Sequence, residues 1–220
     1  MRYRFAVMLV VFASILTGAT VMDRIAVIVG RRAIKTSDID RDLRVSAFLN
    51  RQKVDLSSAA MHSAAERLID QELVRQDLIN GQYTEPTAQD VTDFLGQLKR
   101  DRFNGSDAGL QADLGRYRLT EDQLRRHLLW QLTVLRFIDQ RFRAGVLVTD
   151  EDAAVYYREH QAELQKAYPR DNSLEALGPK IRETLTGERI NQAFEEWLAE
   201  TRKSVRIDYR QQAFNGGTSQ

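Results

Sequence analysis

The sequence predicts a mainly α-helical fold that is closed by one small antiparallel sheet. The chain of 220 residues contains only three prolines, and apolar residues recur at helical spacing through most of its length. Strand signals occur only near the two ends, at Arg24–Val29, Ala33–Lys35 and Val205–Tyr209. Because two short strands alone are marginally stable, we expect all three segments to share one sheet.

The first 19 residues have the three parts of a secretory signal peptide. Arg2 and Arg4 give a positive start, Phe5–Leu16 is an apolar run, and small residues follow up to Ala19. We therefore expect cleavage after Ala19 and export to the periplasm. The alternative is a membrane anchor, but a run of 12 residues is shorter than the roughly 20 that span a bilayer. We expect no stable membrane insertion.

Composition narrows the class of protein further. Residues 1–19 carry two arginines and no acid, so their removal leaves 30 basic against 31 acidic residues, a net charge of −1. Such a balance provides no field that would attract nucleic acid or anionic lipid. The chain has no cysteine, so an exported form must be held together by its core, which is typical of a bacterial envelope protein.

The helices are predicted from capping signals followed by periodic apolar residues. A Ser or Thr precedes an acid or amide by three residues at four places: Ser37/Asp40, Thr87/Asp90, Thr120/Gln123 and Thr149/Asp152. We expect helices from Ser37 through Ala47, over Leu56–Ile79, from Thr87 to an end at Phe103, over Ser106–Leu114, from Thr120 to Arg143, from Thr149 to Leu164, and from a first turn at Pro179 to Lys203. Residues 211–220 are predicted to be a disordered tail.

The predicted helix from Thr120 to Arg143 has two apolar faces. One stripe consists of Leu124, Leu128, Leu132, Leu135, Ile138 and Phe142, and the second of Trp130, Val134 and Phe137. A helix of this kind is either packed between two layers of a core or offers its second face to a partner.

Five segments resemble the SurA-like periplasmic chaperones, the family with a SurA N-terminal domain. They are DRIAVIVGRRAIKTSDID (Asp23–Asp40), AAERLIDQELVRQDL (Ala64–Leu78), LTEDQLRRHL (Leu119–Leu128), VTDEDAAVYYREH (Val148–His160) and IRETLTGERINQAFEEWLAETRKSVRIDY (Ile181–Tyr209). The resemblance implies a multi-helix chaperone core, over residues 20–210, in which a C-terminal helix and strand complete the N-terminal hairpin and helices.

The same resemblance implies a function and one departure from the family. Family members bind unfolded envelope or outer-membrane proteins without ATP, and most carry parvulin-type prolyl isomerase domains before the last helix. Here that place holds only residues 165–172, whereas a compact domain needs on the order of 100 residues. We therefore expect a chaperone that is not an isomerase, and exchange of the terminal helix and strand could produce a domain-swapped homodimer.

Catalytic, cofactor-binding and metal sites are not expected. His62, His127 and His160 lack metal-ligand spacing, and arginines interleaved with Phe137 and Phe142 are more typical of protein contacts than of a nucleic-acid surface. Binding of unfolded clients requires exposed apolar surface with a charged rim. The candidate client-binding residues are Trp130, Val134, Phe137, Tyr156, Tyr157 and Trp197. Two alternatives remain: an isomerase, as the family relation indicates, and a subunit dedicated to one envelope partner.

Overall fold

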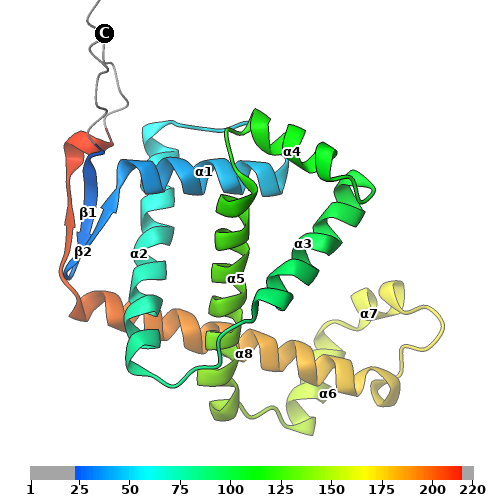
Figure 1. Ribbon diagram of the computed structural model, residues 1–220. Helices are drawn as coiled ribbons and strands as arrows, with labels where there is room; N and C mark the ends of the chain where they lie inside the picture. The colour runs from blue at the N-terminus through cyan, green and yellow to red at the C-terminus, as the bar shows by residue number, and fades with distance from the viewer. Residues whose placement is uncertain (1–22, 215–220) are drawn as a thin grey trace, which may run out of the picture.

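The computed structural model describes residues 23–214, and the predicted signal peptide and cleavage point lie outside this range. The described part contains eight α-helices and one three-stranded sheet (Figure 1). The strands are β1 (Ile25–Val29), β2 (Arg32–Lys35) and β3 (Ile207–Tyr209). The helices are α1 (Thr36–Asn50), α2 (Ser58–Asn80), α3 (Ala88–Phe103), α4 (Asp107–Arg116), α5 (Glu121–Phe142), α6 (Asp150–Glu159), α7 (Gln161–Ala167) and α8 (Leu174–Ser204). The predicted fold class is confirmed.

The sheet joins the two ends of the described chain. Strand β1 lies between β2 and β3 and is antiparallel to both. Val29 is opposite Ile207 and Val27 is opposite Tyr209, so the predicted pairing of the N-terminal and C-terminal strand segments is confirmed. The hairpin turns at Gly30, whose φ of 59° lies in the left-handed region that glycine adopts most readily.

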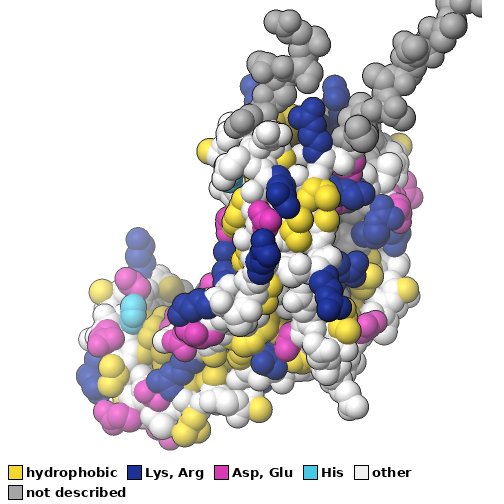
Figure 2. Space-filling view, turned by 90° about the vertical axis from the view of Figure 1, so that its left-hand side faces the viewer, with side chains coloured by type: hydrophobic (Ala, Val, Ile, Leu, Met, Phe, Trp, Pro, Cys, Tyr) yellow, Lys and Arg dark blue, Asp and Glu magenta, His cyan; other side chains and the backbone are white. Residues whose placement is uncertain are grey.

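Basic residues border both outer strands of the sheet. Arg32 and Lys35 lie at the ends of β2, and Arg206 and Arg210 flank β3. On this side of the molecule, Lys and Arg side chains stand among hydrophobic side chains (Figure 2). Charged residues at open edges disfavour pairing with a strand from another molecule, because pairing would bring these charges close together and desolvate them.

Four helices form a frame beside the sheet (Figure 1). In this view α2 and α5 run vertically, α1 crosses their upper ends and α8 crosses their lower ends. Helix α1 contacts α2, and α8 contacts both α2 and α5. Helices α3 and α4 lie on the side of α5 that faces away from α2. Helix α6 packs against α8.

Helix α5 contributes to two separate cores. Leu124 and Leu128 are buried with α3, α4 and the C-terminal half of α1, whereas Phe137 is buried with the sheet, α2 and α8. Of the two alternatives for this helix, packing between two layers of a core therefore describes its buried residues. A third, smaller cluster joins α6 and α7 to the first half of α8.

The structure corrects three predicted helix boundaries. Helix α1 begins at Thr36, two residues before the predicted capping box would start it, because Asp38 accepts from the Lys35 amide at 3.0 Å and the Ser37 hydroxyl donates to Asp23 at 2.6 Å. Helix α6 ends at Glu159, and α7 follows as a separate helix. Helix α8 begins at Leu174 with Ser173 as its N-cap, so Pro179 lies inside the helix.

The prediction of a disordered tail is wrong for its first four residues. Gln211–Ala213 form a short 3-10 helix, and Ala213 and Phe214 are buried in the core beside the sheet. Burial of an aromatic side chain removes apolar surface from water, which outweighs the polar character of the surrounding sequence. Residues 215–220 lie outside the described part of the chain.

Candidate functional site

The frame of four helices encloses a groove of about 600 Å³ that is lined by residues from α1, α2, α5 and α8. Its apolar lining consists of Leu49, Val74, Trp130, Val134, Leu135, Phe194 and Leu198. The volume lies within the roughly 300–1,000 Å³ typical of ligand pockets. It is therefore large enough for a few amino-acid side chains.

Two of the predicted client-binding residues, Trp130 and Val134, line this groove together. Both are partly buried and pack against the core beside the sheet, so each exposes only part of its surface. They lie one helical turn apart on α5, which places their side chains on the same face of the helix.

Leu135 lines the groove although it was not among the predicted client-binding residues. Its side chain belongs to the first apolar stripe of α5, yet 64% of its surface is exposed, and it lines the groove. Helical periodicity identifies residues that share a face, but it does not show whether another element covers that face. Here no described element covers the stripe at Leu135.

The remaining four predicted residues lie elsewhere. Phe137 is 0% exposed, so it cannot contact a client in this conformation. It packs against Trp197, with ring centroids 5.4 Å apart, and Trp197 is itself partly buried in this aromatic cluster. Tyr156 and Tyr157 pack in the separate cluster at α6 and α8. The structure thus distributes the six predicted residues over three places.

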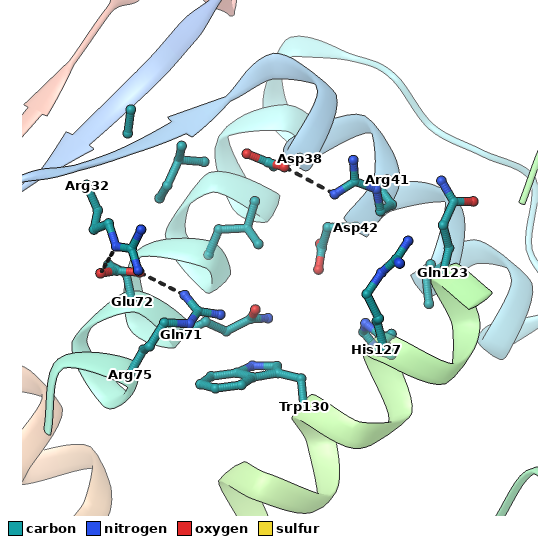
Figure 3. A pocket seen from close by; sticks show the side chains of 15 residues that line it. Arg32, Asp38, Arg41, Asp42, Gln71, Glu72, Arg75, Gln123, His127 and Trp130 are labelled. Carbon is teal, nitrogen blue, oxygen red and sulfur yellow. Dashed lines mark hydrogen bonds and ion pairs between the residues drawn. The ribbon is translucent and has the colours of Figure 1, made fainter. Parts of the chain in front are cut away.

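A second cavity of about 390 Å³ adjoins the groove and shares Asp42, Gln71, His127 and Trp130 with it. Its lining also includes four arginines and two further acids, which come from β2, α1, α2 and α5: Arg32, Arg41, Arg75, Arg126, Asp38 and Glu72. All of these except Arg126 are labelled in Figure 3. This cavity is therefore much more charged than the groove.

The buried acid Glu72 forms ion pairs with two of these arginines. Glu72 is 5% exposed, accepts from Arg75 at 2.7 Å, and has Arg32 at 3.7 Å. Arg75 also lies over Trp130, with its guanidinium carbon 4.5 Å from the ring centroid, which favours one orientation of the indole by cation–π attraction. The Glu72–Arg75 ion pair drawn in Figure 3 therefore helps to position Trp130 in the wall of the groove.

His127 lies where the two cavities meet. Burial lowers the pKa of its imidazole, nearby Asp42 raises it and Arg67 lowers it, with a net decrease. Arg67 donates to the buried Asp42 carboxylate at 2.5 Å. The neutral imidazole is thus the favoured form beside the groove at neutral pH.

A cluster of acidic residues lies where α2 meets α8. Arg202 donates to Glu66 at 2.6 Å and to Asp70 at 2.7 Å, and the Tyr209 hydroxyl donates to Glu66 at 2.5 Å. Burial and the hydrogen bond to Glu66 raise the pKa of Tyr209 to about 12. Burial opposes ionisation of Glu66, but hydrogen bonds from Tyr209 and Arg202 lower its pKa overall. Burial raises the pKa of Asp70, and Glu66 and Glu195 add to this increase.

No group of three or more His, Cys, Asp or Glu side chains among residues 23–214 is arranged to hold a metal ion. Within the same residues, no helix combines the length and apolarity that crossing a membrane requires.

No protein-family model and no curated protein matches the chain.

Proposed function

We propose that the protein is an ATP-independent chaperone of the bacterial envelope. It binds unfolded envelope proteins, including precursors of outer-membrane β-barrels, in the groove between α1, α2, α5 and α8. Barrel precursors expose alternating apolar side chains before they insert, so they aggregate in water unless these side chains are covered.

The groove is the observation that carries this proposal. Trp130, Val134 and the exposed Leu135 offer an apolar surface, and charged residues lie around it. A binding protein that accepts many sequences needs such a surface and needs no catalytic group.

The chain between α6 and α8 supports a function without isomerase activity. Only the 14 residues 160–173 separate the two helices, and α7 occupies half of them. A compact catalytic domain needs on the order of 100 residues. We therefore propose that the protein shields clients and does not isomerise their prolines.

The test is an aggregation assay with the mature chain, residues 20–220. A barrel protein is diluted from urea, and light scattering is followed with and without a several-fold excess of the chaperone. We expect suppression by the wild type and weaker suppression by Leu135→Gln. Ile79→Gln is the control, because Ile79 is similarly exposed (71%, against 64% for Leu135) and does not line the groove.

Unchanged scattering with excess wild-type protein would contradict the chaperone function. Equal loss of suppression in both variants would contradict the assignment to the groove. A pull-down from periplasmic extract separates the remaining alternative, because one stoichiometric partner would indicate a dedicated subunit and would contradict a broad client range.

A further inference from the structure

The groove carries an excess of negative charge beside its apolar lining. Its lining includes three carboxylates, Asp42, Asp70 and Glu195, and one guanidinium group, Arg67. Arg67 is paired with Asp42 and therefore neutralises only that acid. The other two acids, Asp70 on α2 and Glu195 on α8, come from helices that contact each other.

Where α2 meets α8, a single arginine forms ion pairs with two acids. Arg202 bridges Glu66 and Asp70, and Glu195 takes part in no ion pair among residues 23–214. Together with the Asp42–Arg67 pair, this makes four carboxylates and two guanidinium groups, a local charge of −2. The groups are Asp42, Glu66, Asp70 and Glu195, and Arg67 and Arg202.

Glu195 and Asp70 lie close enough to influence each other. Glu195 precedes Arg202 by seven residues on α8, which is close to two helical turns. The side chains of Glu195 and Arg202 therefore lie on the same side of α8, and Arg202 is the ion-pair partner of Asp70. The Glu195 carboxylate contributes to the raised pKa of Asp70. The exposed Glu195 therefore extends the negative potential of Asp70 toward solvent.

The adjoining cavity has the opposite charge balance. Its lining holds four arginines, Arg32, Arg41, Arg75 and Arg126, against three acids, Asp38, Asp42 and Glu72. The chain as a whole is nearly neutral, with 32 basic and 31 acidic residues. The negative charge is therefore a local property of the groove.

We propose that the groove selects segments of unfolded polypeptide in which a large apolar residue lies next to a lysine or arginine. The apolar side chain packs against Trp130 and Val134, and the cation faces Glu195 and Asp70. This selectivity rests on the proposed chaperone function, because it concerns the clients that the same groove binds. Opposite charge at the rim of an apolar site contributes to specificity more than to the total affinity.

The test uses three nine-residue peptides that carry a neutral dye. The first is Gly-Ser-Lys-Leu-Phe-Leu-Lys-Ser-Gly, and the other two have Glu or Gln in place of both lysines. Binding to the mature protein is measured by fluorescence anisotropy at about 20 mM and about 500 mM salt, concentrations at which exposed charges are weakly and strongly screened.

We expect the lysine peptide to bind about tenfold more tightly than the glutamate peptide at low salt, with the glutamine peptide between them. The difference should shrink at high salt. Glu195→Gln should reduce the preference about threefold, which corresponds to the loss of one exposed charge contact. Glu196→Gln should preserve it, because Glu196 is also exposed on α8 but does not line the groove.

Each outcome separates this inference from the proposed function. Equal binding of all three peptides, weakened by Leu135→Gln, would overturn the charge preference and leave the chaperone function standing. Absence of binding by all three would contradict the function of the groove itself. Equal effects of Glu195→Gln and Glu196→Gln would show that the preference arises from the general field of the protein, which also overturns the inference.

Discussion

The ring of Phe214 stacks on the ring of His62, with centroids 4.0 Å apart and planes inclined by 12°. Phe214 is only 1% exposed and belongs to the core beside the sheet. The residues that follow β3 thus return to α2 and cover the core at the place where both ends of the described chain meet.

Phe214→Ala should lower the free energy of unfolding by about 3 kcal/mol, because it removes a buried aromatic side chain and leaves a cavity. Urea denaturation followed by circular dichroism measures this loss. Phe94→Ala is the control, since Phe94 is 47% exposed, and it should cost less than about 1 kcal/mol. Equal losses in the two variants would show that Phe214 does not contribute to the core.

Arg202→Met should destabilise the protein by about 1–2 kcal/mol. The substitution leaves Glu66 and Asp70 without their shared cation, but the partial exposure of all three side chains limits the cost. Arg206→Met is a matched control, because the Arg206 side chain is 87% exposed and lies 3.9 Å from Asp208. Urea denaturation of both variants measures the difference, and a loss at Arg206 as large as that at Arg202 would contradict this role.

His127 should make the stability depend on pH in the acidic range. Its folded-state pKa lies below the unfolded value of 6.5, so the unfolded chain binds the proton first as the pH falls. The stabilising contribution is therefore complete above about pH 6.5 and is lost below it, until the pH passes the folded-state pKa. His127→Gln removes this contribution. The difference in stability between the wild type and this variant therefore isolates the effect of His127 from those of Glu66, whose pKa is lowered, and Asp70, whose pKa is raised.

The measurement is urea denaturation of both proteins between about pH 7.5 and pH 5. The wild type should lose stability more steeply than His127→Gln over this interval. Parallel curves would show that burial does not lower the pKa of the His127 imidazole.

Local signals in the sequence predicted much of the fold. The Thr87, Thr120 and Thr149 capping boxes are present as expected, because their hydrogen bonds join residues only three positions apart. The Ser37 box is wrong because Asp23, 14 residues earlier, binds the Ser37 side chain. A contact of that separation cannot be inferred from capping residues alone.

The candidate site could be predicted only in part, for a similar reason. Trp130 and Val134 were found because they share an apolar face of α5, but Phe137 on the same stripe is covered by α8 and α2. Leu198 and Val74 were missed because they come from other helices and meet α5 only in the folded chain. The strand pairing was predictable because few other segments could pair with β1.

The two tryptophans should report differently on binding in the groove. Trp130 lines both cavities, whereas Trp197 is packed among Phe137, Phe142 and Phe194. Indole emission moves to shorter wavelength when a bound apolar group replaces water. In Trp197→Phe, which keeps Trp130, the Lys-containing peptide should therefore shift the emission maximum to the blue.

Trp130→Phe is the matched variant for this experiment, because the chain contains only two tryptophans and Trp197 alone then emits. Its emission should remain unchanged when the peptide is added, while anisotropy of the labelled peptide shows that binding persists. Both substitutions keep an aromatic ring, so circular dichroism should confirm an intact fold. A shift from Trp197 and none from Trp130 would place the bound peptide outside the groove, because only Trp130 lies on its wall.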